Sequence, residues 1–259
     1  MLRIVSYNIR FGGGRRVPLL AATLASLQPD LVLLQEATNP VAIERLARDA
    51  GFGHVLQQTG WSVAALSREA PASHAWHRPP RGRGFLEVEP AGGHGLRFLD
   101  VHLPAGLSLR GERARLRHVD ALLEVMGGAT GSSTSLLGDL NSVAPGDEPR
   151  VAAMPFWLRL LLRFDGGIRT DVLRRLLDAG WVDAYRHLHP RDAGFTLPPG
   201  APSIRLDYLL VPEALVGRVA RCEPASTLPL VDRASDHLPL VVELATGDDG
   251  EVTQTTDQG

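Results

Sequence analysis

One short stretch of the chain carries an acid and an amide at a spacing that suits chemistry. Asp139 and Asn141 follow the apolar pair Leu136-Leu137, and Gly138 between them lets the backbone turn. Residues two apart in an extended segment point the same way, so both side chains can face one reaction centre. A carboxylate can take a proton and an amide can donate hydrogen bonds. Asp and Asn are also common in turns, where they bond their own backbone, so this stretch alone does not define a site.

Further polar side chains close apolar segments along the whole chain, where local structure does not require them. Strand ends at one edge of packed sheets converge, so distant segments can build one site. Two carboxylates about 4 Å apart repel by about 4 kcal/mol at an effective dielectric near 20, so gathering several requires a cation. Hard oxygen ligands suit Mg²⁺ or Mn²⁺. The predicted set is Asn8, Glu36, His102, Asp139, Asn141, Asp207, Asp236 and His237.

A glycine-rich loop, Gly12–Arg16, follows the strand that carries Asn8 and precedes a helix opened by Pro18. Backbone N–H groups before a helix and two guanidinium groups suit a phosphate. We therefore predict that Arg15 and Arg16 bind substrate. The alternative is an ordinary flexible loop between a strand and a helix.

The segment Phe156–Phe164 has an apolar stripe at helical spacing. It is too short to span a bilayer. We expect it to pack in the core, and a lid or a lipid-contacting helix is the alternative.

Composition narrows the classes of protein. The chain has 259 residues and is 44% hydrophobic, and its net charge of −2 gives no bulk attraction to nucleic acid. It has no lysine, which excludes a lysine nucleophile, and its single cysteine, Cys222, excludes an internal disulfide and a cysteine-rich zinc site. We expect one domain over 1–246, a disordered polar tail over 247–259, and a monomer in the cytoplasm, with no signal peptide and no bilayer span.

Apolar periodicity and breakers predict alternating helices and strands. Short consecutive strands between 53 and 103 favour antiparallel pairing. The arginines of the helix over 108–126 are interleaved with acids, so we expect them to lie on its solvent-exposed face. Expected helices cover 18–27, 40–50, 108–126, 156–164 and 170–179. Expected strands cover 2–10, 31–36, 54–58, 63–67, 75–77, 85–89, 96–103, 204–211 (with Asp207 in its middle), 216–224 and 241–244, with a strand or turn over 180–185.

Six motifs in order resemble the endonuclease/exonuclease/phosphatase superfamily: SYNIR, LQE, DVHL, GDLNS, RLDYLLV and SDHLPL. The resemblance covers nearly the whole chain, from Leu2 to about Leu244. The superfamily includes pancreatic-type deoxyribonucleases, AP endonucleases, inositol-polyphosphate 5-phosphatases and neutral sphingomyelinases. The resemblance implies an α/β fold, a four-layer α-β-β-α sandwich with two central mixed β-sheets, and hydrolysis of a phosphate ester by in-line attack of water.

The resemblance also implies a metal site. Glu36 would be the main Mg²⁺ ligand, with Asn8 nearby. Asp236 would assist the metal either as a ligand or by contacting the residues that bind it.

The same resemblance assigns the reaction steps. Asp139 would orient or deprotonate the attacking water, and Asn141 would hold a phosphate oxygen. His237, oriented by Asp207, would contact the phosphate. His102 would stabilise charge or protonate the leaving group.

The chain departs from the motifs of two branches of the superfamily, which narrows the range of expected substrates. Leu137 stands where 5-phosphatases carry tryptophan, and Phe195–Pro198 lacks the tryptophan that AP endonucleases place before the RLDY motif. We therefore predict a nuclease-like, Mg²⁺-dependent or Mn²⁺-dependent phosphodiesterase. The alternative is a phosphatase or a phospholipid or sphingomyelin-type phosphodiesterase. A catalytically silent phosphate-binding protein ranks below both, because no acid or histidine of the pattern is missing.

Overall fold

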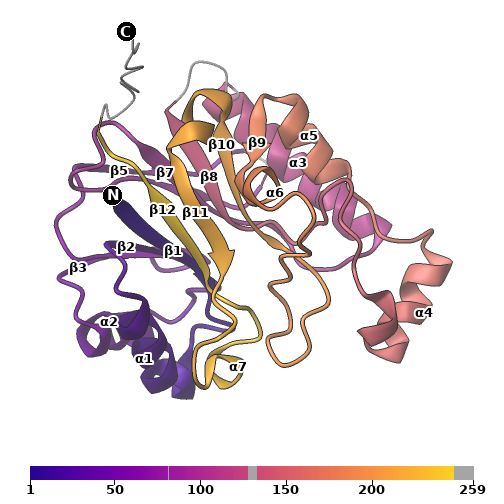
Figure 1. Cartoon of the computed structure of the whole chain (residues 1–259), viewed down its shortest axis with the longest axis horizontal. Helices are drawn as coiled ribbons and strands as arrows, with labels where there is room; N and C mark the ends of the chain where they lie inside the picture. The colour runs from indigo at the N-terminus through magenta and orange to yellow at the C-terminus, as the bar shows by residue number, and fades with distance from the viewer. Residues whose placement is uncertain (81, 128–132, 248–259) are drawn as a thin grey trace, which may run out of the picture.

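The computed structural model consists of two six-stranded β-sheets packed face to face, with helices on the outer face of each (Figure 1). It describes residues 1–80, 82–127 and 133–247. The predicted tail over 247–259 lies outside the described residues, except for Gly247. This architecture confirms the four-layer sandwich that the motifs implied.

Both sheets are mixed. In the first, β1 and β2 are parallel, and in the second, β7 and β8 are parallel, whereas the other pairs are antiparallel. The first sheet has the order β11 (Val219–Pro224), β12 (Leu240–Leu244), β1 (Leu2–Asn8), β2 (Leu31–Gln35), β4 (Val63–Ser67) and β3 (His54–Leu56). The second has the order β5 (Ser73–His77), β6 (Phe85–Glu89), β7 (Arg97–His102), β8 (Thr134–Asp139), β10 (Asp207–Pro212) and β9 (Trp181–Asp183).

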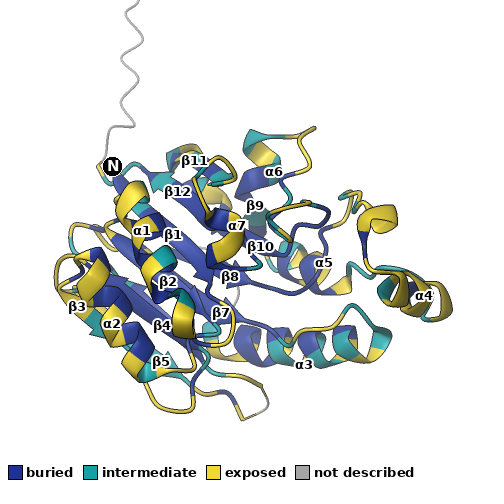
Figure 2. Ribbon diagram, turned by 90° about the horizontal axis from the view of Figure 1, so that it is seen from below, coloured by how far each residue is buried: buried dark blue, intermediate teal, exposed yellow. Residues whose placement is uncertain are grey.

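Helices lie on both sides of the sheets, as the view from below shows (Figure 2). The first sheet is covered by α1 (Val17–Leu27) and α2 (Pro40–Ala50), with the short α7 (Val231–Ala234) beside α1. The second sheet is covered by α3 (Leu109–Met126) and α5 (Asp171–Asp178). The other elements are α4 (Phe156–Phe164), α6 (Ala184–Leu188) and the 3₁₀ helices η1 (Gly14–Arg16), η2 (Val151–Ala153) and η3 (Glu213–Arg218).

Each sheet is covered on one face by the other sheet and on the other face by helices. Its central strands are therefore apolar on both faces. Ile4 of β1 and Leu33 of β2 lie in the cluster between the sheets, whereas Val5 and Leu34 lie in the cluster under α1 and α2. A strand buried on both faces reads as a continuous apolar run, as Leu31 to Leu34 does. The apolar residues thus hold the strands inside the sandwich, and the polar residues at their ends lie at its edge.

Several element boundaries differ from the sequence prediction. The strand β10 begins at Asp207, so this acid is the first residue of the strand and does not lie in its middle. The segment over 180–185 divides, because the Asp183 carboxylate accepts the N–H of Arg186 and starts α6. Residues 216–218 belong to η3, and α7 was not predicted.

One arginine of α3 is buried, so the prediction of a solvated face was wrong at Arg115. Its guanidinium pairs with Glu112 at 2.8 Å and donates to the carbonyls of Pro104 and Gly106. Glu112 in turn accepts hydrogen bonds from the Ser142 hydroxyl and the Val172 N–H. The partners of this ion pair all lie outside α3, so no helical pattern reveals them.

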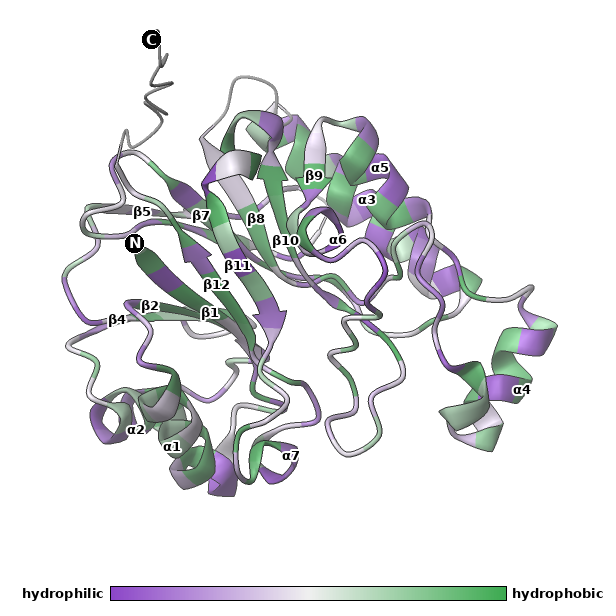
Figure 3. Ribbon diagram, in the orientation of Figure 1, coloured by the Kyte–Doolittle hydropathy of each residue, from purple (hydrophilic) through white to green (hydrophobic). Residues whose placement is uncertain are grey.

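The helix α4 forms at the predicted residues but stands away from the sheets (Figures 1 and 3). Only Leu162 is buried, and it packs in a small apolar cluster with Val143 and Leu206. The large apolar side chains of the other face are exposed. The expectation that the whole stripe packs in the core was therefore wrong. Among the described helices, none is long and apolar enough to cross a membrane.

Gly138 lies opposite Val101 in the β7–β8 ladder, at a φ of 149°. A Cβ there would lie 2.1 Å from the Val101 carbonyl oxygen. We expect Gly138→Ala to lower the free energy of unfolding by roughly 2–4 kcal/mol, through strain and a backbone clash. Urea denaturation measures the change.

Gly217→Ala is the matched control, because nothing lies within 4 Å of its added Cβ. We expect its free energy of unfolding to stay within about 0.5 kcal/mol of the native value. Equal effects of the two substitutions would contradict the account of Gly138.

Candidate active site

The ends of five strands place polar side chains at one edge of the sandwich. Asn8 ends β1, and Glu36 directly follows β2. In the second sheet Asp139 is paired with His102 in the parallel β7–β8 ladder and with Asp207 in the antiparallel β8–β10 ladder. The register of three strands therefore places Asp139 between an imidazole and a second carboxylate.

The Asn8 amide connects the two sheets. Its Nδ2 donates to Asp139 Oδ2 at 2.9 Å and to Glu36 Oε1 at 3.4 Å. Its Oδ1 accepts the backbone N–H of Arg10 at 3.0 Å, which fixes the orientation of the amide. The nitrogen of this amide thus faces both carboxylates.

Asp139 accepts hydrogen bonds from two asparagines, Asn8 and Asn141. Its Oδ1 accepts the Asn141 N–H at 2.9 Å, and its Oδ2 accepts the Asn141 Nδ2 at 3.0 Å. Asn141 reaches this position in the left-handed conformation, at a φ of 48°. Burial raises the pKa of Asp139 to about 7, against the opposing charge of His237. A carboxylate with such a pKa can accept a proton from water near neutral pH.

His237 lies between two carboxylates. Its Nδ1 is 2.9 Å from Asp207 Oδ2, and its Nε2 is 3.8 Å from Asp139 Oδ2. Burial alone would lower the pKa of His237, but the charges of Asp207 and Asp139 outweigh it and raise the pKa to about 10. The ring is therefore an imidazolium. These three residues also form a cluster whose ligand atoms lie within 4.8 Å of one another, a spacing that suits a metal ion.

His102 is held as a neutral imidazole. The Arg83 Nη1 lies 3.2 Å from its Nδ1. A guanidinium has donors only, so Nδ1 accepts and the ring proton resides on Nε2. Burial first, and then the charges of Arg83 and His237, lower the pKa of His102 to about 3. His102 can donate a hydrogen bond from Nε2 at neutral pH, but it carries no charge.

The Glu36 carboxylate has neutral partners. Its Oε2 accepts the Phe11 N–H at 2.6 Å, beside the bond from Asn8. Within residues 1–80, 82–127 and 133–247, no arginine or histidine lies within ion-pair distance of it. Glu36, Arg10 and Phe11 all have positive φ values, as strained residues at functional sites often do. A half-buried carboxylate with no cationic partner, next to an amide and a second carboxylate, fits a hard divalent ion.

The remaining predicted residues lie around the loop over 10–16. Arg16 donates to the carbonyls of Ala234 and Arg10, so its guanidinium braces this loop against the one that carries Asp236. Arg15 is exposed. Asp236 pairs with Arg10 at 3.4 Å and is not hydrogen-bonded to Glu36 or Asp139 in the described part of the chain. Binding of substrate by Arg15 and Arg16, and of metal by Asp236, stays a prediction.

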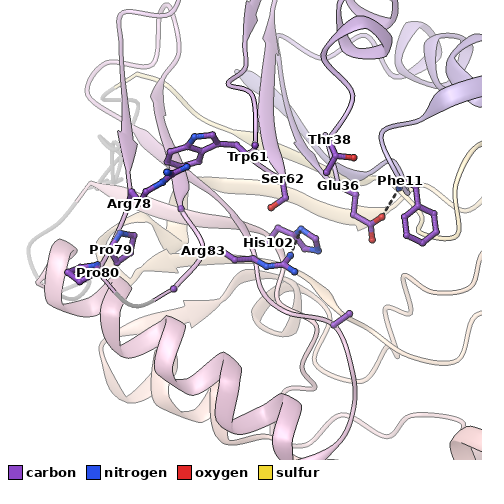
Figure 4. A pocket seen from close by; sticks show the side chains of 14 residues that line it. Phe11, Glu36, Thr38, Trp61, Ser62, Arg78, Pro79, Pro80, Arg83 and His102 are labelled. Carbon is purple, nitrogen blue, oxygen red and sulfur yellow. Dashed lines mark hydrogen bonds between the residues drawn. The ribbon is translucent and has the colours of Figure 1, made fainter.

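A pocket of about 820 Å³ opens beside Glu36 and His102 (Figure 4). Arg83 points toward His102, and Arg78 lies 4.8 Å from the Trp61 ring centroid. Sequence reasoning missed both arginines. The flanking glycines, Gly82 and Gly84, were the sequence signal for Arg83. In the structure, a Cβ at Gly84 would lie 2.0 Å from the Trp61 ring.

A polar layer lies one step deeper between the sheets. The Ser6 hydroxyl donates to Gln35 Oε1 at 3.3 Å, and Gln35 Nε2 donates to Asp100 Oδ1 at 2.6 Å. Burial raises the pKa of Asp100 well above its usual range. This layer joins β2 to β7 directly beneath Glu36 and His102.

Arg205 anchors the loop that carries Asn141. It is buried between Asp183, at 2.6 Å, and Asp147, at 2.9 Å, and its guanidinium lies 4.5 Å from the Tyr208 ring centroid. The Tyr208 hydroxyl donates to the Ser142 carbonyl at 2.9 Å. The backbone just after Asn141 is thus tied to β9 and β10.

Comparisons with known proteins agree with this geometry. The family model described as "Endonuclease/Exonuclease/phosphatase family" matches residues 5–237. The chain therefore belongs to the endonuclease/exonuclease/phosphatase family, whose enzymes hydrolyse phosphoester bonds. None of the curated proteins matches its sequence significantly.

Solved structures share the fold. A 3′ phosphatase from Neisseria, bound to a product DNA hairpin, is similar at a TM-score of 0.72 with 22% identity, over 95% of this chain and 100% of that one. An AP endonuclease from Archaeoglobus fulgidus is similar at 0.72 with 20% identity, over 94% and 99%. A 3′-5′ exonuclease from Neisseria meningitidis is similar at 0.66 with 21% identity, over 94% and 99%.

Removal of the Arg83 guanidinium should raise the pKa of His102. Arg83→Gln takes away a charge that opposes protonation, whereas burial still holds the pKa below the ordinary 6.5. A pH titration followed by NMR of the histidine rings measures the shift. Arg78→Gln changes the same pocket without contacting His102, and should leave its titration as it is. An unchanged His102 titration in Arg83→Gln would refute the pairing.

Arg205→Met should lower the free energy of unfolding by about 3–5 kcal/mol, because it leaves the buried Asp183 carboxylate without a cation and leaves Asp147 paired only with Arg186. Arg221→Met is the matched control, since its partners Glu223 and Glu243 are solvated and its loss should change stability by about 1 kcal/mol at most. Thermal or urea unfolding compares the two. Similar losses in both variants would show that the Arg205 pairs are no stronger than surface pairs.

Proposed function

We propose that this protein is a metal-dependent phosphodiesterase that hydrolyses nucleic acid by in-line attack of water. The observation that carries the proposal is the connected group at the sandwich edge. Asn8, Asp139 and Asn141 are hydrogen-bonded to one another, and Glu36 joins them through Asn8. The hydrogen-bonded pair of His237 and Asp207 joins the same group through the 3.8 Å ion pair between His237 and Asp139.

Glu36 would hold the ion, Mg²⁺ or Mn²⁺. Its carboxylate lies beside the Asn8 amide, whose oxygen would become a ligand only if the amide turned over, and Asp236 would complete the set. His237 already supplies positive charge between Asp139 and Asp207, so the extra cation fits better at Glu36. When bound, such an ion polarises a phosphoryl oxygen and lowers the pKa of a bound water.

The chain's own residues divide the other tasks. Asp139 would orient the attacking water and accept its proton at Oδ2. The His237 imidazolium would hold a phosphoryl oxygen, whose negative charge grows in the transition state. Asn141 would hold another by releasing one of the two hydrogen bonds that its Nδ2 donates, to Leu103 O or to Asp139 Oδ2. Asp207 keeps the His237 ring in place. His102 would donate a hydrogen bond from Nε2 and would not act as an acid, because Arg83 occupies its Nδ1.

The pocket beside the site supports a polyanionic substrate. Arg78 and Arg83 line it together with the Trp61 ring, which can contact a base or sugar. Nucleic acid offers both phosphates and aromatic bases. A monomeric state and a cytoplasmic location stay predictions.

A phosphatase or a phospholipid phosphodiesterase is the second candidate function. The net charge of −2 gives no bulk attraction to nucleic acid. The exposed apolar face of α4 also favours a lipid environment. The substrate panel below separates the two functions.

Purified protein should cleave plasmid DNA or single-stranded RNA with Mg²⁺ or Mn²⁺ and lose this activity in EDTA. Asp139→Asn and His237→Ala should each lower kcat by about 10³-fold, because each removes a proton acceptor or a transition-state charge. Sphingomyelin, an inositol phosphate and bis-p-nitrophenyl phosphate complete the panel.

His74→Ala is the matched control, since this histidine is exposed on β5 and should leave kcat unchanged. Cleavage of only the lipid or small ester would move the protein to the second candidate. Activity that persists in EDTA, or in both site variants, would contradict the proposal.

A further inference from the structure

The helix α4 presents three separate faces. At about 100° per residue, its outward apolar side chains occupy an arc of about 140°. Leu158 and Leu162 project from the opposite side, and Arg159 and Arg163 fill the remaining sector beside Phe156. The outward side chains and their exposed fractions are Phe156 71%, Trp157 66%, Leu160 42%, Leu161 40% and Phe164 82%.

The outward face does not hold the helix on the protein. Leu162 is buried, and Leu158 packs beside it, in the cluster that includes Val143 and Leu206. Asp165 also ties the end of α4 to the start of α3, by accepting the Leu109 N–H. Two leucines and the hydrogen bond to Asp165 thus hold the helix on the protein. The five outward side chains remain free to contact another partner.

Positive charge borders this apolar face. The Arg159 guanidinium lies 5.7 Å from the Phe156 ring centroid, and α4 contains no acid. Arg159 and Arg163 also line a hollow of about 300 Å³ together with Leu162 and Ile168. A phosphate group beside an apolar layer complements this arrangement in both charge and polarity.

The size of the face argues against a second copy of the chain. Stable protein–protein interfaces use roughly 20–30 residues on each side. The outward face has five, on a helix of nine residues that projects from the body (Figures 1 and 2). A bilayer needs only one amphipathic helix with aromatic and aliphatic side chains on one face and arginine on the other.

We propose that α4 docks the protein on the surface of an anionic lipid bilayer. Trp157, Phe164 and the neighbouring apolar side chains enter the boundary between headgroups and acyl chains. Arg159 and Arg163 contact lipid phosphates. The helix lies in the interface and does not span the membrane. The cluster that seats it lies next to Asn141 and Asp207 in sequence, so docking holds the active-site edge close to the lipid surface.

Sedimentation with vesicles of equimolar phosphatidylcholine and phosphatidylglycerol tests the proposal on the full chain. We expect the native protein to bind, with quenching of Trp157 fluorescence by brominated acyl chains. The double variant W157S/F164S should lower the partition coefficient by about tenfold or more, because it removes the two largest apolar contacts. R159Q/R163Q should lose the preference for anionic over pure phosphatidylcholine vesicles.

Val41→Ser is the matched control, because Val41 is an apolar side chain 79% exposed on α2. It should bind vesicles as the native protein does. Circular dichroism verifies that every variant is folded. Absence of native binding, or equal binding by W157S/F164S, would overturn the proposal. Sedimentation equilibrium without lipid supplies another overturning result, namely a dimer that W157S/F164S dissociates.

Discussion

The hydrogen bond from the Asn8 amide to Asp139 is the contact on which the site depends. It joins the end of β1 in one sheet to the end of β8 in the other, at 2.9 Å. The same amide reaches Glu36, so one side chain sets the relative position of two carboxylates from different sheets. Because both partners end strands that are buried on two faces, neither can move without disturbing the core between the sheets.

The charges at this edge are arranged in two groups. Asp139 and Asp207 share the His237 imidazolium, whereas Glu36 is stabilised only by neutral donors. Burying carboxylates without a counter-charge is unfavourable. The first group has one positive charge for its two carboxylates and the Glu36 carboxylate has none, which is why we propose that the metal ion binds at Glu36. A further distinction is that burial, together with the charges of Arg83 and His237, keeps His102 neutral. The site therefore combines one charged and one uncharged imidazole on either side of Asp139.

The fold could be predicted from the sequence because its signals are local. Apolar runs such as Leu31 to Leu34 end at helix-breaking or strand-breaking residues. A continuous apolar run predicts a strand buried on both faces, and therefore a sheet that is covered on both faces. The order of six motifs then identified the superfamily. The positions of Asn8, Asp139 and His237 followed from the ends of the expected strands, whereas Asp207 was expected in the middle of a strand.

The misses depend on contacts between distant residues. Arg115 is buried because loop carbonyls and Glu112 satisfy it, and Arg83 reaches His102 across a loop. The outward face of α4 was assigned to the core because spacing shows which residues share a face but not whether another element covers it. Two leucines are enough to seat this helix, and no periodicity distinguishes that case from full burial.

Anomalous diffraction from crystals soaked in Mn²⁺ would test the central claim most directly. The account predicts a peak within bonding distance of the Glu36 carboxylate, with His237 still hydrogen-bonded to Asp207. A peak coordinated by Asp139, Asp207 and His237, with none at Glu36, would contradict it, because the imidazolium would then not be the cation that those two carboxylates share.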